Sequence, residues 1–116
     1  MTRLLPTTLD ELRDAVAGAL ARAEPVEIVG GGSKRGLGRP LQTAHTLDLS
    51  ALSGVREYAP SELVLTAGAA TPLAEIERVL AEAGQMLAFE PADWRGLLGG
   101  DGEPTLGGAL AANLAG

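Results

Sequence analysis

The sequence has no cysteine, a single histidine and few aromatic residues among its 116 positions. Without cysteine there is no disulfide bond and no thiolate metal site, and His45 alone cannot build a metal centre. Aromatic residues make up only 3% of the chain, whereas hydrophobic residues make up 46%. We therefore expect a folded domain whose core is built from Ala, Leu and Val, with helices packed closely on a sheet.

Long apolar runs and an excess of positive charge are also absent. No apolar run approaches the roughly 18 to 20 residues that a membrane span needs, and the N-terminal residues soon turn acidic instead of forming a signal peptide. We expect the protein in the cytosol, with any membrane association made through partners. The net charge of −6 argues against a nucleic-acid binder. The few cations are better suited to one local anion.

A capping box opens the first predicted helix. Thr8 is the expected N-cap and Glu11 reaches back toward it. Apolar residues then recur at helical spacing, so that the predicted helix spans about 8–23, and Pro25 ends it. The residues expected to face the core are Leu9, Leu12, Val16, Ala19 and Leu20.

Two further helices are predicted nearer the C-terminus. Pro72 is tolerated in the first turn of one, and Gly84 ends it. Its expected buried face consists of Leu73, Ile76, Val79, Leu80 and Ala83. Thr105 can cap a last, mostly apolar helix from Leu106 onward. Because such a helix needs a cover, we expect the chain to be the front part of a longer protein. The alternative is a complete domain whose final helix packs on its own sheet.

Four short apolar runs predict strands at 26–29, 46–49, 55–58 and 63–67. The turn residues Pro60 and Ser61 join the last two of these strands. Residues 90–104 show no period and are interpreted as a long loop.

A run of glycines follows the first of these strands directly. The segment consists of Gly30, Gly31, Gly32, Ser33, Lys34, Arg35 and Gly36. Consecutive glycines let backbone N–H groups turn toward one acceptor with no Cβ in the way, and the hydroxyl and cations add donors. The pattern suits a phosphate or pyrophosphate, and a ligand-free surface loop fits it equally well. The order Ser33-Lys34 departs from a P-loop, and Arg35 stands where the dinucleotide fingerprint needs glycine.

A second glycine cluster occupies the first turn of the last predicted helix. The turn consists of Thr105, Leu106, Gly107 and Gly108. Glycine costs roughly 1 kcal/mol against alanine inside a helix, so its use twice predicts a close approach of the backbone to a ligand or to another chain segment. Free N–H groups and the positive end of the helix dipole lie at such a turn, which also suits a phosphate.

The order of these motifs resembles the FAD-binding domain of the vanillyl-alcohol oxidase/p-cresol methylhydroxylase (PCMH) type, along nearly the whole chain. The resemblance rests on Gly-Gly-Gly-Ser-Lys after a strand, on residues 62–68, on Thr71-Pro72-Leu73 and on residues 105–113. Within that family, residues 84–87 and Phe89-Glu90-Pro91 are most similar to the small FAD-binding subunits of bacterial glycolate oxidases.

The resemblance implies an α/β (α+β) fold of two subdomains with FAD between them. Residues 1–116 would form an incomplete domain, in which about 1–90 are the first small subdomain and about 91–116 open the second. Residues 30–36 would be the pyrophosphate loop, residues 105–108 the second FAD-contacting turn, and Pro91 would lie near the flavin ring. Some relatives attach flavin through a histidine in or beside the first loop. Residues 30–36 contain none, so we expect non-covalent FAD and a solvent-exposed His45.

The activity implied by the resemblance is the oxidation of a small 2-hydroxy acid such as glycolate, with the chemistry supplied largely by the flavin. The chain alone is expected to be inactive, and its partners would include a second FAD subunit and an iron–sulfur subunit. Arg95 is either a contact for the substrate carboxylate or a structural arginine. Two other classes stay open. One is a non-catalytic nucleotide-binding or subunit-scaffolding module, and the other is a phosphotransferase, which the failed P-loop order disfavours.

Overall fold

The structure is a computed structural model that describes residues 2–31, 43, 45–89 and 102–112. Its elements are β1 (Thr2–Leu4), α1 (Leu9–Ala21), β2 (Val26–Val29), β3 (His45–Asp48), β4 (Val55–Ala59), the 3-10 turn η1 (Pro60–Glu62), β5 (Val64–Ala67), α2 (Leu73–Glu82) and α4 (Leu106–Ala112). The helices and strands confirm the α/β class, and each predicted helix and strand is present, with its ends among the described residues within two residues of the prediction.

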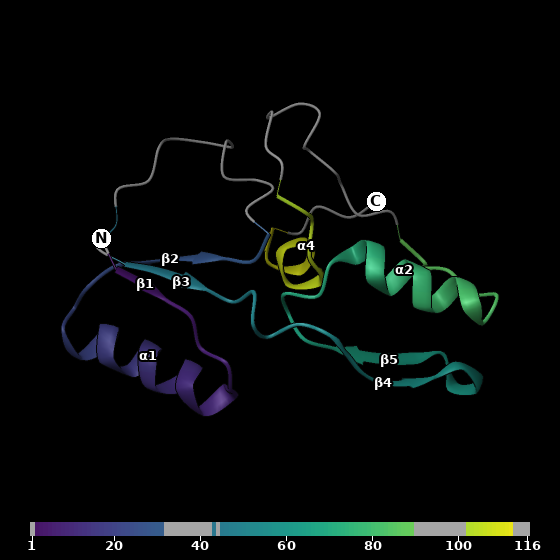
Figure 1. Cartoon of the computed structure of the whole chain (residues 1–116), viewed down its shortest axis with the longest axis horizontal. Helices are drawn as coiled ribbons and strands as arrows, with labels where there is room; N and C mark the ends of the chain where they lie inside the picture. The colour runs from purple at the N-terminus through teal and green to yellow at the C-terminus, as the bar shows by residue number, and fades with distance from the viewer. Residues whose placement is uncertain (1, 32–42, 44, 90–101, 113–116) are drawn as a thin grey trace.

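A three-stranded parallel sheet occupies the N-terminal half, with the strand order β1-β3-β2 (Figure 1). The first residue of the central strand, His45, is in register with both Thr2 and Val26. The sequence does not predict β1, because a strand of three residues has no periodicity of its own. Its pairing with β3, which is distant in the sequence, defines it.

Helix α1 has Thr8 as its N-cap, as predicted, but the Glu11 side chain bonds Thr7 instead of Thr8, and the helix is less buried than predicted. The Thr8 hydroxyl accepts the Glu11 N–H at 3.1 Å, and the Glu11 carboxylate accepts the N–H and hydroxyl of Thr7 at 2.6 and 2.8 Å. Ala19 is buried, whereas Leu9, Val16 and Leu20 are 70%, 50% and 80% exposed. The prediction of a five-residue buried face is therefore wrong for these three, because three short strands cover only part of the helix.

The C-terminal half is an antiparallel β4–β5 hairpin on which α2 and α4 pack (Figure 1). Its core consists of Leu73, Ile76, Leu80 and Ala109, with Val55, Tyr58, Leu65, Ala67, Leu87 and Leu106 packed against it. The predicted inner face of α2 is confirmed at its three leucine and isoleucine positions, whereas Ala83 is exposed. Gly84 ends α2 with a φ of 70°, in the left-handed region that glycine favours.

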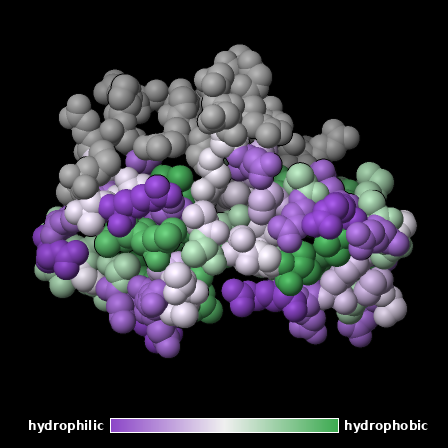
Figure 2. Space-filling model, viewed as in Figure 1, coloured by the Kyte–Doolittle hydropathy of each residue, from purple (hydrophilic) through white to green (hydrophobic). Residues whose placement is uncertain are grey.

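Both halves leave some apolar side chains exposed. Figure 2 shows apolar surface between α1 and the parallel sheet, and again between α2 and the hairpin. In the part of the chain that the structure describes, no helix is both long and apolar enough to cross a membrane.

Candidate functional site

The two glycine segments that the sequence singles out lie against each other. Gly30 and Gly31 follow the carboxyl end of β2, the end of a parallel strand at which α/β proteins bind ligands. A Cβ added to Gly30 would lie 2.9 Å from the Thr105 hydroxyl oxygen, and one added to Gly31 would lie 1.7 Å from the Glu103 carbonyl oxygen. The bare backbone of the first segment therefore lets the second approach it.

A third segment, residues 69–73, holds the second glycine turn by backbone hydrogen bonds. The Leu106 N–H donates to the Thr71 carbonyl at 3.0 Å, and the Gly107 N–H donates to the Ala69 carbonyl at 2.8 Å. In the other direction, the Leu73 N–H donates to the Pro104 carbonyl at 3.0 Å. Residues 69–73 and 104–107 thus run beside each other, with Pro72 and Thr105 forming an antiparallel bridge. Sequence reasoning assigned no role to Ala69 or Glu103.

The N–H groups of the second glycine turn are not free, which corrects the sequence expectation. Leu106 and Gly107 donate to the carbonyls of Thr71 and Ala69, and the Gly108 N–H donates to the Thr105 hydroxyl at 3.1 Å. Thr105 therefore caps α4, as predicted. These intramolecular bonds occupy the donors that the sequence analysis assigned to a phosphate.

The glycine at position 107 is explained by a neighbouring chain segment. A Cβ there would lie 2.9 Å from both the Cβ and the carbonyl oxygen of Ala69. Of the two interpretations of glycine in this turn, the structure supports close approach of another segment for Gly107. The remaining predicted site residues lie outside the described residues: Gly32, Ser33, Lys34, Arg35, Gly36 and Pro91, as does Arg95.

His45 is not the solvent-exposed histidine that the sequence analysis expected. Its side chain is only 16% exposed, because β3 is flanked by a strand on each side. Its Nε2 bonds the Glu24 carboxylate, which also accepts from Arg22, and its buried Nδ1 has no partner among the described residues. The hydrogen bonds from His45 and Arg22 lower the pKa of Glu24. This group lies at the amino end of the sheet, away from the glycine segments.

Asp48 is a buried carboxylate at the carboxyl end of β3, and sequence reasoning gave it no role. It is 5% exposed, accepts the Ser50 N–H at 2.9 Å and pairs with Arg3. Burial raises the pKa of Asp48, but the hydrogen bonds from Ser50 and the adjacent Arg3 outweigh that effect and hold its pKa below the ordinary value. Asp48 thus fixes the chain just after the strand and ties β3 to β1.

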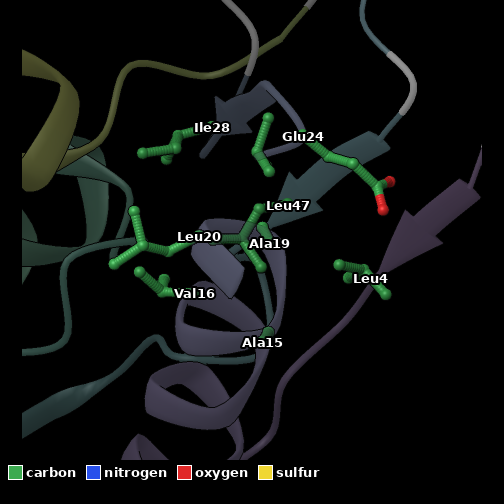
Figure 3. A pocket seen from close by; sticks show the side chains of 9 residues that line it. Leu4, Ala15, Val16, Ala19, Leu20, Glu24, Ile28 and Leu47 are labelled. Carbon is green, nitrogen blue, oxygen red and sulfur yellow. The ribbon is translucent and has the colours of Figure 1, made fainter. Parts of the chain in front are cut away.

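A separate groove of about 230 Å³ lies between α1 and the parallel sheet (Figure 3). Its lining is apolar apart from one carboxylate and consists of Leu4, Ala15, Val16, Ala19, Leu20, Glu24, Val26, Ile28 and Leu47. Its volume is smaller than the roughly 300 to 1,000 Å³ of typical ligand pockets. Its lining residues offer no cation for a phosphate. Among the described residues, no group of three or more His, Cys, Asp or Glu side chains could hold a metal ion.

Comparison with known proteins assigns the chain to a family. The model of the family described as FAD binding domain matches residues 3–116. The chain is also 44% identical over 105 residues to the glycolate oxidase subunit GlcE of Escherichia coli (strain K12). That match covers 90% of this chain and 28% of GlcE, so the chain spans less than a third of the relative's length.

Proposed function

Because the chain belongs to this family of FAD-binding domains, with FAD as its cofactor, we propose that its two glycine segments form the FAD site. Residues 30–36 bind the pyrophosphate without a covalent bond to the flavin, residues 105–108 form the facing wall, and Pro91 lies near the flavin ring. The observation that carries the proposal is the contact of Gly30 and Gly31 with Thr105 and Glu103.

The described residues are compatible with such a site. The first glycine segment leaves the carboxyl end of a parallel strand, and its two described glycines present backbone without side chains. Since Leu106, Gly107 and Gly108 already donate their N–H groups within the chain, we assign the phosphate hydrogen bonds to the first segment. The second segment then contributes a wall with little side-chain bulk.

The proposed activity of the whole protein is the oxidation of a small 2-hydroxy acid such as glycolate. The 44% sequence identity to a glycolate oxidase subunit supports this assignment. FAD supplies the hydride-accepting chemistry when bound, and the protein contributes binding, orientation and exclusion of side reactions. We further propose a cytosolic protein that works in a complex with a second FAD subunit and an iron–sulfur subunit.

An absorbance spectrum of the purified full-length protein, followed by acid precipitation, tests the cofactor assignment. We expect a flavin band whose chromophore is released into the supernatant. Flavin that stays in the pellet would contradict the non-covalent assignment, and a protein that neither carries nor takes up FAD would contradict the site.

The site residues are tested by Lys34→Gln, which we expect to weaken FAD binding. Arg78→Gln, at an exposed position of α2, removes the same charge away from the site and serves as the control. Equal FAD affinity in both variants would argue against a phosphate contact at Lys34.

A non-catalytic nucleotide-binding or scaffolding module is the second candidate. It is favoured by the contact between Gly31 and Glu103, since packing of two chain segments by itself requires glycine there. Anaerobic addition of glycolate and of other small 2-hydroxy acids separates the candidates. Bleaching of the bound flavin supports the oxidoreductase, whereas bound flavin that none of these acids reduces supports the module.

A further inference from the structure

Thr71 is the most deeply buried polar residue of the described chain, with no exposed surface. Its hydroxyl oxygen accepts the Gly54 N–H at 2.9 Å, and its O–H donates to the Gly68 carbonyl at 2.7 Å. The hydroxyl therefore joins the loop before β4 to the turn after β5. Buried backbone groups need such partners, because unpaired ones are costly.

The backbone of the same residue continues this connection toward the glycine segments. The Thr71 carbonyl accepts the Leu106 N–H, and two residues earlier the Ala69 carbonyl accepts the Gly107 N–H. The turn held in this way begins at Thr105, whose hydroxyl oxygen would lie 2.9 Å from a Cβ on Gly30. The Thr71 hydroxyl is thus connected to the contact between the two glycine segments through residues 69–73 and the turn that begins at Thr105.

We infer that Thr71 is a positioning residue for the FAD site. Its hydroxyl fixes residues 69–73, and the carbonyls of that segment set where residues 105–108 lie against Gly30. The inference rests on the proposed function of the two glycine segments. Thr71 itself acts through residues 69–73 and the second glycine turn, and we assign it no contact with FAD.

The test compares FAD affinity in variants of the full-length protein, measured by the change in flavin fluorescence on binding. Thr71→Val keeps the shape and removes the hydroxyl, and we expect FAD to bind about tenfold more weakly. Thr71→Ser keeps the hydroxyl and should retain affinity within about threefold. If Thr71→Val fails to fold, Thr71→Ser against Thr71→Ala makes the same comparison, because both lack the methyl group.

Ile76→Val is the control for a merely structural role. It removes one methyl group from the core that Ile76 shares with Leu73 and Ala109, and it leaves the hydrogen bonds of the Thr71 hydroxyl in place. We expect it to lower the melting temperature with FAD affinity unchanged. Thr71→Val with wild-type affinity for FAD would overturn the inference, and so would an equal loss of affinity in Ile76→Val.

Amide hydrogen exchange of the unmodified protein adds a measurement that needs no variant. The Leu106 and Gly107 amides should exchange slowly whether or not FAD is bound, since carbonyls of the chain hold them. Protection that appears only with FAD would overturn the inference. Wild-type protein that takes up no FAD at all would overturn the proposed function and this inference with it, whereas FAD binding that ignores Thr71 overturns the inference alone.

Discussion

Gly31 lies so close to Glu103 that a Cβ on the glycine would be 1.7 Å from the carbonyl oxygen of the glutamate. The obstructing atom belongs to the backbone, so a side-chain rotation cannot relieve the clash. Residues 30–31 and 103–105 therefore hold their spacing only while position 31 is glycine. The first glycine segment has a packing requirement in addition to the role that we propose toward FAD.

Gly31→Ala should separate the two glycine segments and weaken FAD binding. We expect it to destabilise the protein by about 1 to 3 kcal/mol, as overpacking does. Chemical denaturation and FAD titration measure the two effects. Gly18→Ala is the matched control, because its Cβ would meet only the end of the flexible Arg22 side chain at 3.1 Å. Alanine in this helix should stabilise the protein by about 0.5 to 1 kcal/mol. Wild-type stability and FAD affinity in Gly31→Ala would contradict the packing argument.

Much of the local structure follows from the sequence, because its causes are local. Thr8 caps α1, and Gly84 ends α2 with a positive φ, both as their residue types predict. Periodicity reports which face of a helix is apolar, but not what covers that face. The same kind of pattern therefore predicts burial for both Ile76 and Leu20, although Ile76 is 1% exposed and Leu20 is 80% exposed.

The candidate site could be predicted only as separate pieces. Both glycine clusters are visible in the sequence, whereas their mutual contact depends on the long-range pairing of residues 69–73 with 104–107. No local pattern shows that Ala69 lies only 2.9 Å from where a Cβ on Gly107 would be. For the same reason the sequence alone predicts that the N–H groups of the second turn are free. The one available signal was Thr71-Pro72-Leu73, which carried part of the family resemblance.

Asp48 should make the folded protein less stable as the pH falls. Its pKa lies below the ordinary value of 3.8 in the folded protein, so its ionised form stabilises the fold above that value. This contribution is lost as the pH falls through the folded-state pKa. We expect Asp48→Asn to be less stable at neutral pH and to lose less stability on acidification. Denaturant unfolding between neutral pH and pH ~3 measures both effects.

Asp14→Asn is the control for Asp48, because it removes the same charge from an exposed position of α1. The stability of Asp14→Asn in denaturant unfolding should stay close to that of the wild type at neutral pH. If the stability of Asp48→Asn falls with pH in parallel with that of the wild type, the result would argue against the stabilising role of the ionised carboxylate.

Leu63 adopts a left-handed backbone conformation, with a φ of 59°, and is 77% exposed. This conformation is costly for a residue with a branched side chain, whereas asparagine tolerates it. Leu63→Asn should therefore stabilise the hairpin by of order 1 kcal/mol. Thermal unfolding measures the gain. Leu63→Ala keeps a Cβ at the same φ and should therefore raise stability only slightly. An equal gain in both variants would mean that the stabilisation comes from removing the exposed leucine.

Truncation should cost much more stability at Ile76 than at Leu20, although the sequence predicts both to be buried. Ile76 is 1% exposed in the core formed by α2, α4 and the hairpin, so Ile76→Ala leaves a cavity and should cost about 2 to 5 kcal/mol. Leu20 is 80% exposed beside the apolar groove, so Leu20→Ala should change stability by less than about 0.5 kcal/mol. Urea denaturation of the two variants measures the difference. A large loss in Leu20→Ala would mean that, in the protein as purified, this side of α1 is covered by something that binds the folded state.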